Sequence, residues 1–484
     1  MNKISLITLA VCAGLPVMAQ TPTSLTISSG DSNVSFYGIL DAGVGHVSHT
    51  LGFDEYHPVG TNPTVGSKTA TTSATGVFNG GISQTRIGVK GSTAICEDLK
   101  GIFVLESAIN LNSGNISNAA QGMALNTSAA SAQTFSADSA IDGQLFSRAA
   151  YIGLSSKSYG TLTIGRHTSM MLDAVPAFDA LQGAQLFTPI GYSGAYGGGG
   201  ATDSSRLDNS LKYKLNVEGF NAGVLYKFGG VAGSTSSRSA LEAGLGYEIG
   251  GFAVQFIYQG IKDATSISNP DGVINLGVTA VPANGATPAV KAVNAEYEPL
   301  GTVTLTCENT TSRELLVRYK TEIWGIYAGY QKIAYDNPSN PVQDAGISSV
   351  YGYAVGQYDA TAGAVSNTKL STMPYATTVN PFITERDWTV TFISANVNAT
   401  KKLNLALGFY NVEQNAYTAG SFKGTTSTYV AGSTNYSSFL ADYTMVKNLD
   451  AYLGVMNVKA LGGMATGYAF SSNTTLGLGL RYKF

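Results

Sequence analysis

Long apolar runs are missing from this chain after its first residues. No later stretch approaches about 18 continuous apolar residues, which argues against a protein that crosses a membrane with helices. Charge is also scarce, at 12% Asp, Glu, Lys and Arg, and the net charge of −3 gives no case for a nucleic-acid partner. Proline is rare (14 of 484), whereas glycine (57), tyrosine (27) and phenylalanine (19) are abundant. This composition favours a large antiparallel β-barrel in an outer membrane.

The amino terminus has the pattern of a secretory signal peptide. Lys3 supplies the cation, residues 4–15 are apolar, and residues 17–19 (VMA) form a junction that a signal peptidase can cut. We therefore expect residues 1–19 to be a cleaved signal peptide, and residues 20–484 to form a single domain. Export without a helical anchor leaves the periplasm, the outer membrane or the medium as destinations.

The last ten residues, TLGLGLRYKF, alternate strictly between two kinds of side chain. Leucine, tyrosine and phenylalanine occupy the even positions from 476 to 484, and glycine, arginine and lysine occupy the odd ones. A β-strand with one lipid face and one wet face has this period of two. Because Phe484 is in phase with the apolar face, we predict that it ends the strand that closes a barrel.

The same period recurs from residue 34 onward, and it predicts sixteen strands of a transmembrane antiparallel β-barrel. In residues 386–397, for example, Trp388, Val390 and Phe392 mark the apolar parity. Sixteen strands enclose an aqueous lumen, whereas eight strands are filled by side chains. The predicted spans are 34–47, 81–92, 99–112, 146–156, 160–167, 206–217, 220–229, 239–249, 251–260, 313–321, 323–334, 386–397, 402–412, 435–446, 449–459 and 473–484.

Short and long connections alternate between these spans. The short ones, such as residues 218–219, are assigned to the periplasmic end, and the long ones, such as 261–312 and 335–385, to the cell exterior. This map places Cys96 and Cys307 at opposite ends of the barrel. Their Cα atoms would then lie beyond the limit of about 7 Å for a disulfide, so we expect two free thiols.

Five stretches of the chain resemble a known family. They are VSFYGILDAGVG at 34–45, SQTRIGVKGS at 83–92, FSRAAYIGLSSKSYGTLTIGRH at 146–167, DNSLKY at 208–213 and the terminal GLRYKF. Together, and in this order, they are similar to the trimeric general porins of Gram-negative outer membranes, closest to the β-proteobacterial type. The resemblance implies sixteen strands, a homotrimer embedded in outer-membrane lipid, and a third outer loop, about residues 168–205, folded into the pore.

The resemblance also implies a pore constriction in which arginines of one wall face carboxylates of the third loop. Three arginines match the motifs, in the RIGVKG, SRAAYIGL and TIGRH stretches. The loop stretch MMLDAVPAFDAL supplies two aspartates, and FVLES supplies an acidic lumen residue. The candidate constriction residues are thus Arg86, Arg148, Arg166, Asp173, Asp179 and Glu106. Such a ring would hold a transverse field across a narrow aqueous gap.

Strand parity supports the three arginines unequally. Arg86 shares parity with Gly88 and Lys90, so it points into the lumen, where a charge avoids the cost of about 2 to 4 kcal/mol at the bilayer midplane. Arg148 shares parity with the apolar Ile152 and Leu154, so strand parity alone does not direct its side chain inward. Arg166 has the parity of lipid-facing residues, so we expect the chain to bend there into the third loop.

Other candidate sites are weaker. His46, His49 and His57 lie in or near a flexible glycine-rich loop that fixes no geometry, so we expect no metal site there. His167 beside Ser169 is the only pair that could suggest a hydrolase, but adjacent residues rarely form a base and nucleophile.

We therefore expect no enzyme and no cofactor, but a channel for passive diffusion of ions and small hydrophilic solutes. The alternative is a surface-binding or structural barrel with a loop-occluded pore. The sequence leaves the preferred solute and the ion selectivity open.

Overall fold

The computed structural model covers the whole chain and describes its barrel and part of its loops. The first 24 residues are outside the described residues, and so is the predicted signal peptide. The structure describes residues 25–49, 71–112, 114, 145–190, 206–230, 233–237, 239–262, 264–267, 273–274, 297–298, 303–306, 309–337, 357–359, 364–366, 376–378, 383–420, 426–466 and 469–484.

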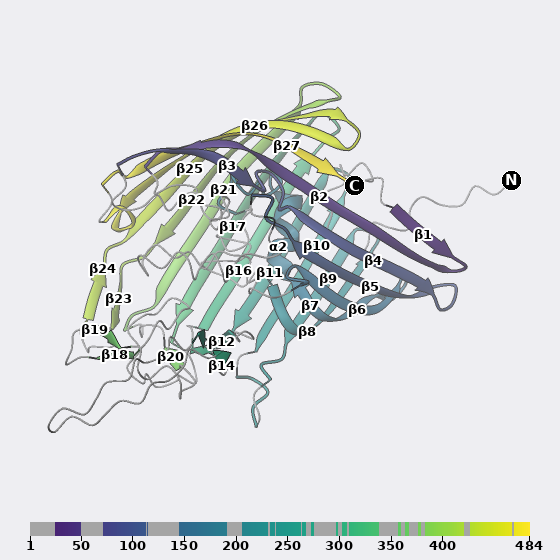
Figure 1. The fold of residues 1–484 in the computed structure, drawn as a ribbon, viewed down its shortest axis with the longest axis horizontal. Helices are drawn as coiled ribbons and strands as arrows, with labels where there is room; N and C mark the ends of the chain where they lie inside the picture. Colours follow the sequence, from purple (N-terminus) through teal and green to yellow (C-terminus); the bar gives the residue numbers. More distant parts are fainter. Residues whose placement is uncertain are drawn as a thin grey trace.

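Sixteen long antiparallel strands form a closed barrel, which confirms the predicted fold class (Figure 1). Each strand pairs with its neighbours in sequence order. The strands are β2 (Ser32–Val47), β4 (Arg86–Ala94), β5 (Leu99–Ala108), β6 (Ala149–Ser156), β7 (Gly160–Thr168), β8 (Arg206–Val217), β9 (Phe220–Lys227), β10 (Ala240–Ile249), β11 (Phe252–Ile261), β16 (Asn309–Lys320), β17 (Trp324–Asp336), β21 (Arg386–Asn398), β22 (Leu403–Gln414), β25 (Gly432–Val446), β26 (Leu449–Gly462) and β27 (Ser472–Lys483).

The barrel closes where β27 pairs with β2. The register runs from Ile39 opposite Lys483 to Val47 opposite Thr475. Phe484 extends this pairing through two backbone hydrogen bonds. Its N–H donates to the Gly38 carbonyl at 3.1 Å, and its carbonyl accepts from the Gly38 N–H at 2.9 Å. A Cβ on Gly38 would lie 2.5 Å from the Phe484 ring, so only glycine admits the ring there. Phe484 therefore lies at the closing seam.

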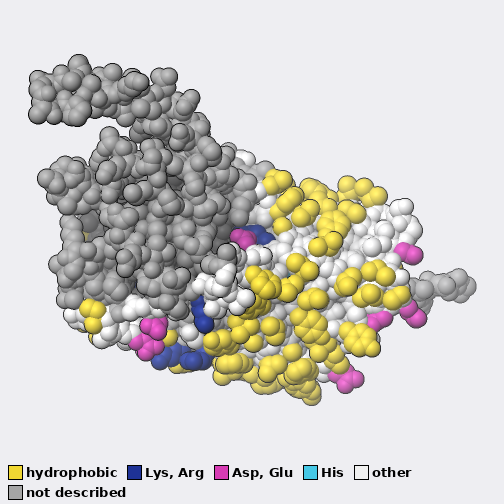
Figure 2. Space-filling view, turned by 90° about the horizontal axis from the view of Figure 1, so that it is seen from below, with side chains coloured by type: hydrophobic (Ala, Val, Ile, Leu, Met, Phe, Trp, Pro, Cys, Tyr) yellow, Lys and Arg dark blue, Asp and Glu magenta, His cyan; other side chains and the backbone are white. Residues whose placement is uncertain are grey.

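Side chains alternate between the two faces of each strand, as the sequence predicts. In β27, Leu478 and Leu480 are 60% and 53% exposed on the outer face, whereas Thr475 and Arg481 are buried on the inner face. Yellow apolar side chains cover much of the outer wall in Figure 2. A band of this kind is the surface that a barrel presents to lipid.

Two additional strands and several loop elements were not predicted. Strand β1 (Leu25–Ser29) and strand β3 (Ala74–Asn79) each pair with β2. With the sixteen spanning strands they form one eighteen-stranded sheet. Helix α2 (Met170–Phe178) follows β7, and a 3₁₀ turn, η2 (Gly463–Ala465), follows β26. The loops contain the short strands β12 (Ala264–Ile267), β13 (Val273–Ile274), β14 (Tyr297–Glu298), β15 (Val303–Thr306), β18 (Gln357–Asp359), β19 (Ala364–Ser366), β20 (Ala376–Thr378), β23 (Tyr417–Gly420) and β24 (Thr426–Tyr429).

The inner face of the barrel is mostly apolar along β17 to β26. Trp388, Val390 and Phe392 point inward and are 6%, 2% and 9% exposed, so placing them on the lipid face was wrong. They pack in one cluster with Val175 and Phe178 of the segment after β7. The alternate positions of β21, such as Ile393, face outward. The outward parity also contains Thr389 and Thr391, so the more apolar parity of this strand is the one that faces the interior.

Tight turns join the strands at one end, where Cys96 is an exposed free thiol. Cys307, by contrast, lies outside the described residues. The structure therefore tests the prediction of a free thiol for Cys96 but not for Cys307. Among the described residues, no helix is long and apolar enough to cross a membrane.

Candidate functional site

The segment from Ser169 to Ile190, which we call loop 3, lies inside the barrel. The Ser169 hydroxyl caps helix α2 by accepting from the Leu172 N–H at 3.1 Å, as short polar side chains do at helix N-termini. The Met170 N–H donates to the buried Glu242 carboxylate of β10 at 2.6 Å. The Met170 methyl group lies 2.6 Å from where a Cβ on Gly244 would be. This end of loop 3 is therefore fixed to the inner face of β10.

The other end of the helix is held by Arg318 of β16. Its guanidinium donates to the Ala177 carbonyl at 2.8 Å and lies 5.0 Å from the centre of the Phe178 ring. A second nitrogen of the same group pairs with Glu248 of β10 at 2.8 Å. A cation at a helix C-terminus opposes the partial negative charge there. Helix α2 thus bridges two neighbouring parts of the inner wall.

Beyond the helix, loop 3 reaches the opposite side of the barrel. Phe187 is fully buried and packs on Gly454 of β26 and Gly477 of β27, whose missing side chains make room for the ring. The Leu186 N–H donates to the Gly81 carbonyl at 2.8 Å. Loop 3 therefore spans the interior between β10 and β26.

Asp173, a predicted constriction residue, lies in the first turn of α2. Its carboxylate pairs with Lys212 of β8 at 2.7 Å and with the neighbouring Lys214. Burial alone would raise the pKa of Asp173, but the two lysines outweigh burial and hold the pKa of this carboxyl well below its usual range. Asp173 is thus neutralised by lysines of the adjacent wall.

Asp179, the second predicted loop carboxylate, is buried at the far end of α2. It accepts from the Gly183 N–H at 3.0 Å, the Ser394 hydroxyl at 2.9 Å and the Tyr410 hydroxyl at 2.8 Å. Burial raises the pKa of Asp179, and these hydrogen bonds oppose the rise. The contacts tie loop 3 to β21 and β22.

Arg86, Arg148 and Glu106 form one group on the inner wall. The Arg148 guanidinium lies 2.6 Å from the Glu106 carboxylate, and Arg86 lies 3.8 Å from it. The Tyr37 hydroxyl donates to the second Glu106 oxygen at 3.0 Å, and the Lys90 ammonium lies 4.8 Å from the centre of the Tyr37 ring. The Arg86 side chain is 22% exposed, the most of the three. Two cations therefore share one carboxylate, with Arg86 the most accessible.

Arg148 and Arg166 both depart from straight strand parity. Arg148 precedes the first residue of β6, so the alternation of that strand does not determine the direction of its side chain. The side chain turns toward Glu106. At Arg166 the pairing of β7 with β8 shifts register between Gly165 and His167, the bend that the sequence led us to expect. The Arg166 guanidinium is buried, donates to the Ser147 carbonyl at 2.8 Å and pairs with Asp208.

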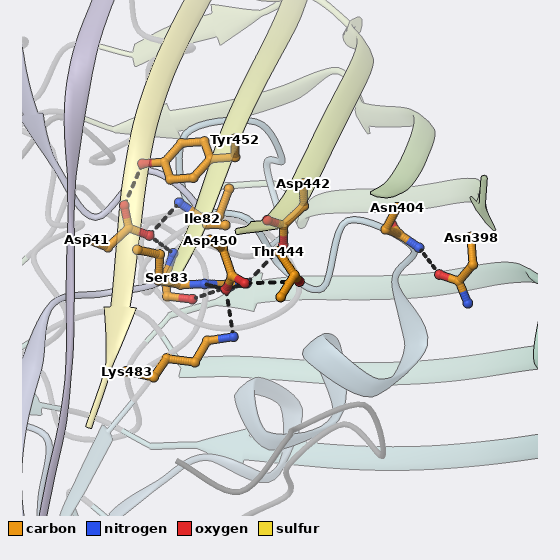
Figure 3. Close-up of polar contacts among 11 residues, drawn as sticks. Asp41, Ile82, Ser83, Asn398, Asn404, Asp442, Thr444, Asp450, Tyr452 and Lys483 are labelled. Carbon is orange, nitrogen blue, oxygen red and sulfur yellow. Dashed lines mark hydrogen bonds and ion pairs between the residues drawn. The ribbon is translucent and has the colours of Figure 1, made fainter. Parts of the chain in front are cut away.

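Two further arginines of the inner wall were not among the candidate constriction residues, although the alternation of the last strand already placed one of them, Arg481, on the wet face. Arg206 donates to the Arg148 carbonyl at 3.1 Å, which adds a third guanidinium beside the Arg86 group. Arg481 binds Asp450 at 2.8 Å and Asp442 at 2.9 Å. Figure 3 labels these two aspartates. The motif GLRYKF contains Arg481, and DNSLKY begins two residues after Arg206, so closer reading of both motifs could have found them.

Asp41, in the same view, anchors the chain before β4. Its carboxylate accepts from the Ile82 N–H at 3.0 Å, the Ser83 N–H at 2.7 Å and the Tyr452 hydroxyl at 2.5 Å (Figure 3). The Ser83 hydroxyl in turn accepts from Arg481 at 3.0 Å. These contacts hold residues 80–83 against the inner wall, just before Arg86.

The histidines have ordinary structural partners. His46 contacts the Thr75 hydroxyl at 2.8 Å, His49 contacts the Ser472 carbonyl at 2.7 Å, and His57 lies outside the described residues. His167 contacts the Ser210 hydroxyl at 2.8 Å, while Ser169 caps α2. In the part of the chain that the structure describes, no cluster of His, Cys, Asp or Glu could hold a metal.

The sequence profile of the Gram-negative porin family matches residues 5–357 of the chain. The chain belongs to the Gram-negative porin family. This places the porin in the outer membrane. The family membership agrees with the resemblance carried by the five sequence stretches.

Individual relatives are distant. An outer membrane porin protein of Bordetella pertussis is 29% identical over 227 residues, which cover 47% of this chain and 48% of that protein. Outer membrane porin protein 32 of Delftia acidovorans is 28% identical over 235 residues, covering 47% of this chain and 50% of that protein. The chain thus matches about half the length of these curated relatives.

A solved structure shows the same fold. The anion-selective porin from Comamonas acidovorans superposes with a TM-score of 0.55 at 15% sequence identity, covering 94% of this porin and 100% of that chain. The shared fold is the sixteen-stranded barrel described above.

Proposed function

We propose that this porin forms a water-filled channel through which ions and small hydrophilic solutes diffuse passively, and that it acts as a homotrimer. The observation that carries the proposal is a closed sixteen-stranded barrel with an apolar outer band and charged side chains on its inner wall. Barrels of this size enclose an aqueous lumen. No reaction is required, because solutes move down their own gradients.

We further propose that loop 3 narrows this channel and that its free side faces the Arg86 group. Arg86, Arg148 and Arg166 keep their proposed place at the narrow part, together with Glu106, Asp173 and Asp179. The contacts refine the roles. Asp179 docks the loop, and Asp173 is balanced by two lysines. The field across the gap then comes mainly from Arg86, which is the most exposed of the group.

The charges near Arg86 support a preference for anions. Arg86 and Arg148 share one carboxylate, Glu106, so two cations here meet one anion. The positive excess would attract anions and repel cations in a narrow gap between low-dielectric walls. This assignment extends the sequence analysis, which left selectivity open.

Single-channel recording in a planar bilayer with a salt gradient tests the function. Stepwise currents in groups of three, with a reversal potential on the anion side, are expected from the purified protein. Folded, heat-modifiable protein that gives no current steps would refute the channel and favour the surface-binding barrel with an occluded pore.

Two substitutions test the constriction. Arg86→Ala and Arg148→Ala should each shift the reversal potential toward cation selectivity, with the larger shift for the more exposed Arg86. Lys157→Ala removes the same charge from an exposed periplasmic turn and serves as the matched control. If neither arginine variant moves the reversal potential relative to this control, the constriction lies elsewhere.

A further inference from the structure

Charge is distributed unevenly around the periplasmic rim of the barrel. Half of its eight turns carry acidic residues, and magenta side chains lie along part of this rim at the right of Figure 2. The acidic turn residues are Asp31, Glu97, Asp98, Glu218 and Glu322. The two hairpins that join β21 to β22 and β25 to β26 instead carry Lys401, Lys402 and Lys447. Lys157 in the turn between β6 and β7 lies beside Asp98, whereas Lys401, Lys402 and Lys447 gather at one sector of the rim.

These three lysines line a single cavity. It is a shallow, open cavity of about 600 Å³, lined by the lysines together with Thr444, Met445 and Val446. The lysines are exposed, and among the described residues none of them forms an ion pair with a carboxylate. Lys402 donates one hydrogen bond, to the Met445 carbonyl at 3.1 Å, which turns its side chain toward the neighbouring hairpin. Three positive charges therefore converge on one space.

The cavity borders the apolar outer wall. Met445 and Val446 are 43% and 62% exposed, and Tyr443 above them is 44% exposed on the outer face of β25. The pairing of β25 with β26 shifts register between Thr444 and Val446, so Met445 is a bulged residue. The bulge places apolar side chains directly beside the lysines. A ligand in this cavity would contact the ammonium groups of the lysines and also the apolar side chains of Met445 and Val446.

We propose that Lys401, Lys402 and Lys447 form a binding site for the phosphate headgroup of an anionic phospholipid in the periplasmic leaflet. Lysine binds phosphate as a compact point charge, and lysine clusters at a membrane interface attract anionic lipids. The adjoining apolar residues favour a lipid over free phosphate, because they supply contacts for the first part of the acyl chains. The site needs only the barrel in the outer membrane and does not depend on conduction.

Native mass spectrometry of the detergent-solubilised trimer, mixed with defined lipid, provides the test. Phosphatidylglycerol should remain bound to the wild type, and zwitterionic phosphatidylcholine should not. The triple variant Lys401→Gln, Lys402→Gln and Lys447→Gln should lose phosphatidylglycerol, by roughly fivefold in affinity for each lysine removed. Lys157→Gln, which removes a lysine beside the acidic Asp98, should retain it.

Each other outcome overturns the proposal. Unchanged phosphatidylglycerol retention in the triple variant would remove the lysines from lipid binding. Equal retention of phosphatidylcholine would show that headgroup charge is not recognised. Complete displacement by inorganic phosphate at millimolar concentration would define a site for free anions. Dissociation of the trimer in the triple variant would assign the lysines to subunit contacts. Conductance of the triple variant should equal that of the wild type.

Discussion

Removal of the Phe187 ring should release loop 3 from the inner wall without unfolding the barrel. Phe187 is 0% exposed, and its ring packs on Gly454 and Gly477 and lies edge-on to Tyr452 at 6.4 Å. Truncation of a buried phenylalanine to alanine typically costs about 3 to 5 kcal/mol. Because the barrel strands keep all their backbone pairing, we expect this cost to appear as local opening of loop 3.

Hydrogen exchange of the Leu186 amide measures that opening directly, because this N–H is bonded to Gly81 across the docking contact. A loss of about 3 to 5 kcal/mol corresponds to exchange faster by about 10² to 10³-fold or more. Phe409→Ala is the matched control, since this ring is 55% exposed on the outer face of β22. Exchange in Phe187→Ala that equals that of the control would refute the docking argument.

A second substitution tests the same contact from the opposite side. In Gly454→Leu, the new Cβ would lie 2.7 Å from the Phe187 ring, so the ring must move and exchange should again rise. The double variant Phe187→Ala and Gly454→Leu places the leucine in the space that the ring vacated. It should exchange more slowly than either single variant, because volume-conserving changes are tolerated best. Additive losses would show that the two residues do not share a packing contact.

Two further predictions concern Asp173 at the start of loop 3 and Gly165 of β7, the strand before it. Asp173→Asn should speed exchange in α2 at neutral pH, and this effect should shrink as the pH falls from the usual aspartate range toward the lowered pKa of Asp173. The pKa of Asp173 is lowered by its two lysine partners, so its stabilisation is present above the unfolded pKa and is lost as pH falls through the folded pKa. Gly165→Ala should destabilise the barrel by more than about 1 kcal/mol in denaturant titrations, because its φ is +141° and its Cβ would meet the Ala150 carbonyl at 2.2 Å. Gly30→Ala, with φ of +56° and open space, should cost less.

The strands could be predicted well because lipid and water impose opposite demands on alternate residues. Strand β8 has the predicted bounds of 206–217, and the other spanning strands differ by a few residues at their ends. The largest shift is at β4, which begins at Arg86 rather than at residue 81, and β5 ends at Ala108 rather than at residue 112. In both places the chain leaves the strand and packs inside the barrel, so the alternation of inward and outward side chains no longer applies.

The partners of the site residues could not be predicted, because they are distant in sequence. Asp179 binds Ser394 and Tyr410, which are 215 and 231 positions further along the chain. Motif matching brought Arg86, Arg148 and Glu106 to one wall, and the structure joins them in one group. It could not show which loop carboxylate is balanced by lysines and which is buried. Those properties follow from how loop 3 docks, not from local patterns.

The docking of loop 3 divides the interior into two unlike halves, and this division bears on the path of solutes. Along β17 to β26 the inner face is closed by packing, with Tyr436 at 1% and Met456 at 0% exposure. The wall of β4 to β10 keeps accessible charges, because the Lys214 side chain is 39% and the Glu248 side chain is 42% exposed. Water and solutes need polar, accessible walls, so in the proposed channel they pass along the charged half. Loop 3 thus acts as a partition whose position is set by its contacts with the apolar half.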